Sequence, residues 1–116
     1  MNIHRGEIYL VDLSQNIGSE QGGVRPALVV QNNQGNIYSS TTIVCPLTSK
    51  LKSVTATHVT LSPNDCGILV ESTVLCEQVR VISKERIRKK LGELKDQNKI
   101  EDINKKIMVS LGLEAL

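Results

Sequence analysis

One arginine of this chain lies in a segment that would hold its guanidinium at a defined position. Gly22 and Gly23 let the backbone turn or approach a ligand closely just before Arg25, and Pro26 fixes φ at the start of an apolar strand. Thr48 ends another apolar strand. An arginine can clamp a phosphate with paired N–H donors, and a hydroxyl can donate a further hydrogen bond. The two side chains therefore suit a phosphoryl transition state, and the alternative is a turn that carries a solvated arginine.

Other polar residues could complete such a site. The candidates are Glu20, Gln21, Asn32, Glu77 and Gln78. The chain has two histidines, and neither is a strong candidate for catalysis, because His4 lies near a terminus and His58 lies on the polar side of an alternating strand. The sequence contains no Gly-x-Ser-x-Gly, His-Glu-x-x-His or P-loop motif.

The cysteines indicate free thiols. Cys45, Cys66 and Cys76 are an odd number without Cys-x-x-Cys spacing, and no secretory signal precedes them. Cys45 and Cys76 lie in apolar runs and are expected in the core. A zinc site from Cys66, Cys76 and His58 would lack the usual ligand spacing. We therefore expect a cytoplasmic protein with no metal, no cofactor and no membrane segment.

Composition predicts one mainly-β domain over residues 1–116. The chain has 40% hydrophobic residues but no Phe or Trp and two Tyr, so its core must consist of Val, Ile and Leu. With so few aromatic side chains for bases to stack on, nonspecific binding of single-stranded nucleic acid is not expected. The net charge is +2 overall, −1 over residues 1–83 and +3 over residues 84–116. A nucleic-acid ligand would therefore be bound through placed groups rather than bulk electrostatics.

The pattern of apolar residues predicts a small antiparallel barrel over about residues 1–83 and a helical part over about residues 84–113. The expected strands are residues 7–13, 27–31, 41–47, 57–61 and a strand or bent pair at 73–82, with a loop at 14–25 and turns at 32–40 and 62–65. Ser83 would cap a helix from Lys84 to Lys95 with Ile87, Leu91 and Leu94 on one face. Asp96 would cap a second helix that ends at Gly112, with Ile100, Ile103, Ile107 and Leu111 as its buried stripe. The basic run Lys84–Lys90 is either a solvated face or a surface for phosphates or an acidic partner.

Seven segments, in this order, resemble the MazF/PemK toxins, and the similarity is closest to the MazF branch of Gram-positive bacteria. They are Arg5-Gly6-Glu7-Ile8-Tyr9, Gly18 to Pro26, Leu28 to Asn32, Leu47-Thr48, Thr57-His58-Val59, Glu77-Gln78-Val79-Arg80 and Ser110-Leu111-Gly112-Leu113. The resemblance covers nearly the whole chain. The Ser62–Val70 segment and the pair Cys45-Pro46 depart from the family pattern.

The resemblance implies an SH3-like barrel of the CcdB/PemK type that works as a homodimer. It implies a toxin of a type II toxin-antitoxin system, neutralised by a cognate antitoxin of MazE type. The implied activity is sequence-specific, metal-independent cleavage of single-stranded RNA, including mRNA. Arg25 and Thr48 match the family's catalytic residues. The RNA-binding residues that carry over are Ser19, Glu20, Gln21, Asn32, Glu77 and Gln78.

The chemistry of RNA fits this assignment. The 2′-hydroxyl is the nucleophile, so the expected products are a 2′,3′-cyclic phosphate and a 5′-hydroxyl, and the protein must align the phosphate and stabilise its charge. Arginine is a poor base, and the sequence does not identify the proton acceptor. The alternative function is that of the related CcdB proteins, which share the barrel and poison a topoisomerase by binding without catalysis.

Overall fold

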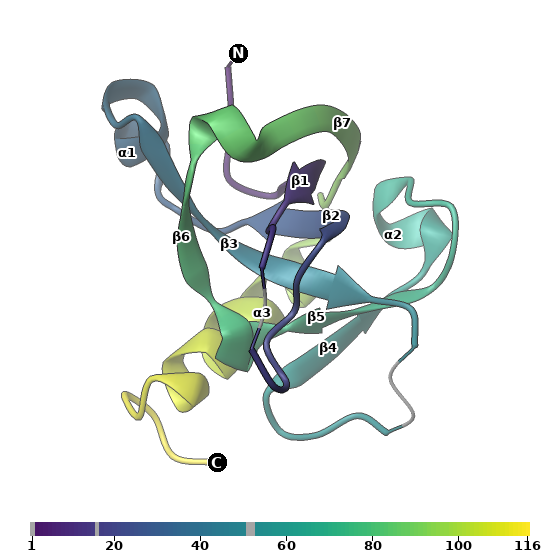
Figure 1. The fold of residues 1–116 in the computed structure, drawn as a ribbon. Helices are drawn as coiled ribbons and strands as arrows, with labels where there is room; N and C mark the ends of the chain where they lie inside the picture. The colour runs from purple at the N-terminus through teal and green to yellow at the C-terminus, as the bar shows by residue number, and fades with distance from the viewer. Residues whose placement is uncertain (1, 16, 51–52) are drawn as a thin grey trace.

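The computed structural model describes residues 2–15, 17–50 and 53–116, which form a strongly bent antiparallel sheet with a helix packed against it (Figure 1). Among these residues the sheet has seven strands in the order β4-β5-β3-β2-β1-β7, with β6 paired to β3. The strands are β1 Glu7–Asp12, β2 Val24–Val29, β3 Thr41–Thr48, β4 His58–Leu61, β5 Ser72–Leu75, β6 Arg80–Ser83 and β7 Ile87–Glu93. The helices are α1 Asn33–Tyr38, α2 Pro63–Cys66 and α3 Gln97–Ser110, with short 3₁₀ turns η1 Cys76–Gln78 and η2 Lys84–Arg86.

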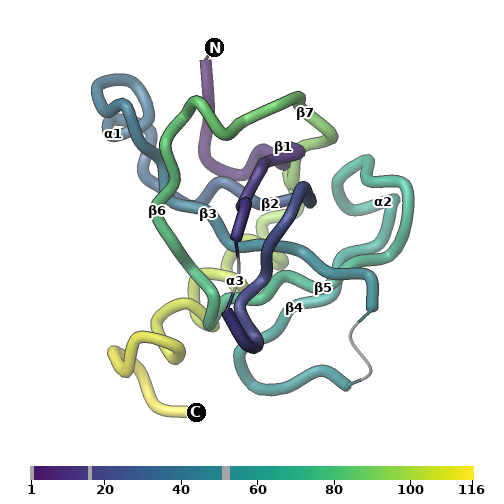
Figure 2. The backbone as a smooth tube through the Cα atoms, viewed as in Figure 1, coloured from purple at the N-terminus to yellow at the C-terminus, as the bar shows by residue number. Residues whose placement is uncertain are grey.

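Strand β3 closes the barrel because it pairs with three strands. Its first half pairs with β6, from Thr41 opposite Ser83 to Val44 opposite Arg80. Its middle pairs with β2, and its last two residues, Leu47 and Thr48, pair with β5. The backbone trace in Figure 2 shows β3 crossing the molecule between these partners. The expected antiparallel barrel is therefore confirmed, and its centre is the strand that ends at Thr48.

Both faces of the central strands are buried, which explains their continuous apolar sequences. Alternate residues of a strand point to opposite faces, and the two faces pack into two separate clusters. One cluster contains Ile8, Leu28 and Cys45 and is covered by α3 through Ile103. The other contains Val11, Ala27, Val29 and Val44 and is closed by Ile82 and Ile87. The predicted core positions of Cys45 and Cys76 are confirmed.

Helix α3 begins and ends where the sequence predicts. The side chain of Asp96 accepts a hydrogen bond from the Asn98 backbone, and Gly112 adopts a left-handed φ of 75° after the last turn. Ile103 is buried with Ile100 and Ile107 beside it. Leu111 is not part of this stripe, because it is 57% exposed. No helix in the described ranges is long and apolar enough to cross a bilayer.

The predicted helix from Lys84 to Lys95 is wrong. Ser83 caps only the single 3₁₀ turn η2, and residues 87–93 form strand β7, which pairs with β1. Two register shifts interrupt this pairing, so Ile87 reaches one core cluster while Leu91 and Leu94 reach the other. A bulged strand thus reproduced the apolar spacing of a helix face.

The basic run Lys84–Lys90 mainly holds β7 against β1. Arg88 pairs with Asp12 at 3.1 Å, and Lys90 pairs with Glu7 at 2.7 Å. Arg86 donates to the hydroxyl of Ser14 at 2.7 Å. Lys84 Nζ donates to the backbone oxygen of Asn36, so four bases of the run have intramolecular partners.

Three smaller differences concern loops and one strand. The expected turns at 32–40 and 62–65 contain the short helices α1 and α2, and β2 begins at Val24 instead of residue 27. The segment 73–82 is the bent pair, because η1 separates β5 from β6.

Candidate functional site

Arg25 and Thr48 lie on neighbouring strands at the same end of the sheet. The antiparallel β2–β3 register runs from Val29 opposite Val44 to Ala27 opposite Pro46, and Arg25 and Thr48 lie two residues beyond its end, where Thr48 pairs with Thr73 of β5. Both side chains line one open cleft of about 330 Å³. The remaining lining residues are Pro26, Leu47, Ser49, Lys50, Val70 and Ser72.

The loop before β2 holds the guanidinium of Arg25. Its base is closed by hydrogen bonds from Leu13 N to Gly23 O and from Gly23 N to Ser14 O. Gly23 has a φ of 72°, which favours glycine. Arg25 Nε donates to Gly22 O at 2.8 Å, and Nη1 donates to the Gln21 side-chain oxygen. These bonds use Nε and one N–H of Nη1 and, within the described residues, leave Nη2 for a ligand.

Thr48 presents its hydroxyl to the same cleft. Its Oγ1 accepts a hydrogen bond from Lys50 N at 3.2 Å, so the O–H can still donate to a ligand. Lys50 also brings a cation to this cleft. Lys50 is not among the predicted site residues, although its position two residues after Thr48 was the available signal.

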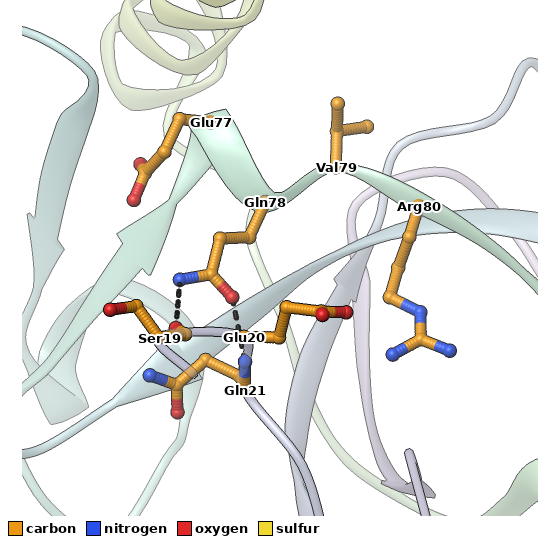
Figure 3. A pocket seen from close by; sticks show the side chains of 7 residues that line it. All are labelled: Ser19, Glu20, Gln21, Glu77, Gln78, Val79 and Arg80. Atoms are coloured by element: carbon orange, nitrogen blue, oxygen red, sulfur yellow. Dashed lines mark hydrogen bonds between the residues drawn. The ribbon is translucent and has the colours of Figure 1, made fainter. Parts of the chain in front are cut away.

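Five of the six residues predicted to bind RNA line a second cleft of about 580 Å³ (Figure 3). They are Ser19, Glu20, Gln21, Glu77 and Gln78. The Gln78 amide joins the two segments, because Gln21 N donates to its Oε1 at 2.8 Å and its Nε2 donates to Ser19 O at 3.1 Å. Figure 3 shows Glu77 and Ser19 at one end and Arg80 at the other. Val79 and Arg80 line this cleft but were not among the predicted binding residues.

Gln21 connects the two clefts. Its backbone is fixed by Gln78, and its side-chain oxygen accepts from Arg25. A ligand that displaces Gln21 in one cleft would therefore change the position of Arg25 in the other.

The carboxylate of Glu77 is held by two residues at the start of β4. Thr57 Oγ1 donates to Glu77 Oε1 at 3.1 Å, and His58 Nε2 lies 3.1 Å from Oε1 and 3.2 Å from Oε2. The His58 side chain is only 8% exposed, whereas that of Glu77 is 38% exposed. A buried histidine therefore holds the carboxylate of Glu77, which is itself partly exposed at the cleft.

Asn32 lies in neither cleft. Its side chain accepts from Gly35 N at 2.8 Å and caps helix α1. Its predicted role in RNA binding remains a prediction, and the observed role is structural.

The cysteines and His4 contribute no reactive group to these clefts. A hydrogen bond with Cys76 and burial raise the pKa of the Cys45 thiol, and burial raises that of Cys66, so neither is a ready nucleophile. His4 lies 3.7 Å from Glu7. In the parts of the chain that the structure describes, no three His, Cys, Asp or Glu side chains are grouped as a metal site.

Comparisons with known proteins identify relatives of nearly the full length. Residues 4–111 match the PemK-like, MazF-like toxins of type II toxin-antitoxin systems. The chain is 41% identical over 115 residues to the endoribonuclease MazF of Staphylococcus saprophyticus, covering 98% of this chain and 95% of that protein.

Two solved structures share the fold. MazF from Deinococcus radiodurans superposes with a TM-score of 0.82 at 26% identity, covering 97% of this chain and 98% of that one. A MazE-MazF structure from the same organism has a TM-score of 0.77 at 26% identity, covering 98% and 99%. The resemblance read from the sequence is confirmed, and the chain belongs to the PemK-like, MazF-like toxin family of type II toxin-antitoxin systems.

Proposed function

We propose that this protein is an endoribonuclease toxin that cleaves single-stranded RNA, including mRNA, at a specific sequence and without a metal ion. The single observation that carries the proposal is that Arg25 and Thr48 line one cleft. The match to an endoribonuclease over nearly the full length supports the same activity.

In the proposed reaction the RNA supplies its own nucleophile. The 2′-hydroxyl loses its proton to solvent as its oxygen attacks the adjacent phosphorus, the bond to the 5′-oxygen breaks, and that oxygen takes a proton from solvent. The products are a 2′,3′-cyclic phosphate and a 5′-hydroxyl. Arg25 Nη2 and the Thr48 hydroxyl donate hydrogen bonds to the phosphate oxygens as their charge rises, and each bond contributes about 2–4 kcal/mol to the transition state. The described residues that line this cleft include no carboxylate and no histidine, so electrostatic stabilisation is the main contribution assigned to them.

The second cleft would read the sequence of the RNA. Carboxylates and amides can pair with the edges of unstacked bases, whereas they do not attract a phosphate backbone. Glu20, Gln21, Glu77 and Gln78 supply these groups beside the phosphate cleft. Cleavage would be specific for RNA, because DNA lacks the 2′-hydroxyl that acts as the nucleophile.

A cognate antitoxin of MazE type would hold the toxin inactive in the cytoplasm, and the toxin would work as a homodimer formed from single 1–116 domains. The relatives include a solved MazE-MazF structure. This chain also exposes apolar side chains that a partner could cover. They include Leu69, which is 96% exposed, and Val81, Met108 and Leu113.

The test is digestion of a long RNA in EDTA, followed by sequencing of the cut ends. We expect cleavage at one short sequence, cyclic phosphate ends, no cleavage of the matching DNA, and a loss of about 10²-fold or more in Arg25→Ala. Undiminished cleavage by Arg25→Ala would remove Arg25 from its assigned role. Tight binding to a topoisomerase without RNA cleavage would overturn the function itself.

A further inference from the structure

The best-supported part of the second cleft is the carboxylate of Glu77. It lies in η1, immediately after β5, and its hydrogen-bond donors are His58, the first residue of β4, and Thr57, the residue before it. The two strands are paired, with His58 opposite Leu75. The sheet therefore fixes the position of this exposed acceptor.

The hydrogen bonds assign the tautomer of His58. Thr55 N donates to His58 Nδ1 at 3.1 Å, so Nδ1 must carry a lone pair. The proton of a neutral imidazole is then on Nε2, which faces both oxygens of Glu77. His58 is therefore a buried residue whose Nδ1 accepts a hydrogen bond from Thr55 N and whose Nε2 donates a hydrogen bond to Glu77.

We propose that His58 is a positioning residue for RNA recognition, which holds the Glu77 carboxylate as an oriented acceptor for the amino group of one base. This inference rests on the proposed function. A carboxylate offers about four lone-pair sites, and the contacts from Thr57 and His58 leave room for a further donor on Oε2. Adenine, cytosine and guanine each carry an exocyclic amino group, and uracil carries none. The site therefore favours an amino-bearing base over uracil at one position of the recognised sequence.

Two substitutions separate the two hydrogen bonds of His58. An asparagine oxygen takes the place of Nδ1, so His58→Asn keeps the acceptor for Thr55 N and loses the donor to Glu77. A glutamine nitrogen takes the place of Nε2, so His58→Gln keeps the donor to Glu77 and loses the other bond. A purely structural role of His58 in anchoring the loop predicts that Asn is the better replacement, whereas the positioning role predicts Gln.

The first measurement is steady-state cleavage of the RNA sequence identified for the wild type and of its single uracil substitutions. We expect His58→Asn to raise KM about tenfold with little change in kcat, and to reduce the wild-type preference for the amino-bearing base by a similar factor. His58→Gln should retain most of both. Equal losses in the two variants, or a loss confined to kcat, would overturn the proposal.

The second measurement needs neither activity nor a variant of His58. Nitrogen-detected NMR of the wild type should show the Nε2–H tautomer of His58, and Glu77→Gln should shift its Nε2 resonance more than its Nδ1 resonance. An Nδ1–H tautomer would exclude the donor role even if the variants failed to fold. A wild type that cleaves no RNA would refute the proposed function instead, and the NMR result would still report the His58–Glu77 pair.

Discussion

Arg25 and Thr48 line the same cleft, Arg25 from β2 and Thr48 from the last position of the neighbouring strand β3. Their backbones are therefore held by the sheet, although one follows a glycine loop and the other precedes a polar one. Groups that stabilise a transition state must be in place before the charge develops. A sheet edge meets this requirement better than two independent loops.

The hydroxyl of Thr48, rather than its size, should determine its contribution. Thr48→Val keeps the shape and removes the O–H donor, so we expect the cleavage rate to fall about 10²-fold. Thr48→Ser keeps the donor and should lose less than about tenfold. Single-turnover cleavage of the recognised RNA measures both, with thermal unfolding as the control for folding. Equal rates for the Val and Ser variants would mean that the hydroxyl does not act on the phosphate.

Gln21 should determine how strongly the positive charge of Arg25 acts on the phosphate of the RNA. Its side-chain oxygen accepts from Arg25 Nη1, so a carboxylate at this position would pair with the guanidinium and compete with the phosphate. We expect Gln21→Glu to lower kcat/KM about 10²-fold, and Gln21→Ala to lower it about tenfold by loosening the arginine. Raising the salt concentration should partly restore Gln21→Glu only, because salt screens the added charge. An order of activities with Glu above Ala would contradict this coupling.

Periodicity predicted the strands well where burial alone decides their structure. Val29 and Val44 belong to runs that have no helical alternative, and the sequence placed them in strands correctly. The spacing of Ile87, Leu91 and Leu94 led to the wrong prediction of a helix, because two bulges in the β1–β7 pairing produce the same pattern as a helix face. The information that distinguishes the two structures lies in β1, whose Asp12 and Glu7 pair with Arg88 and Lys90.

For the site, the sequence predicts which residues carry the chemistry but not the contacts that hold them. Arg25 and Thr48 were selected by type and by the family pattern, but their presence in one cleft depends on which strands lie side by side, which no local pattern reveals. His58 was set aside as a surface histidine of an alternating strand, and it is buried because η1 folds over it with Glu77. Asn32 has a side chain that suits base recognition and also suits helix capping, and the structure shows the second role.

Gly92 provides a sharp test of β7 as a strand packed on α2. A Cβ at this position would lie 2.0 Å from the backbone oxygen of Cys66, so one backbone would have to move. We expect Gly92→Ala to lower the free energy of unfolding by about 3 kcal/mol in urea titrations. Gly18→Ala is the matched control, because its Cβ would meet nothing within 4 Å and only its φ of 58° is unfavourable. It should cost about 1–2 kcal/mol. If residues 84–95 formed the helix that the sequence predicts, Gly92→Ala would be neutral or stabilising.

Glu7, Tyr9 and Lys90 form a polar cluster where β1 meets β7. Glu7 accepts from Tyr9 Oη at 2.9 Å and from Lys90 Nζ at 2.7 Å. Burial would raise the pKa of Glu7, but the hydrogen bonds from Lys90, His4 N and Tyr9 outweigh it and lower the pKa below its usual 4.5. Burial and the bond to Glu7 raise the pKa of Tyr9 to about 12. The cluster thus stabilises the fold most between the unfolded pKa values of Glu7 and Tyr9, which are about 4.5 and about 10.

The alkaline limit can be measured on Tyr9 alone. The chain has two tyrosines and no tryptophan, and Tyr38 is 82% exposed, so in Tyr38→Phe the tyrosinate absorbance reports only Tyr9. Because the folded pKa of Tyr9 lies above the unfolded value of about 10, its stabilisation is complete below pH 10 and is lost as the pH rises towards 12. The loss should reach about 2–3 kcal/mol, and it should be much smaller in Tyr38→Phe/Tyr9→Phe, which lacks the phenol. A titration midpoint near 10 in the folded protein would show that Tyr9 is not held by Glu7.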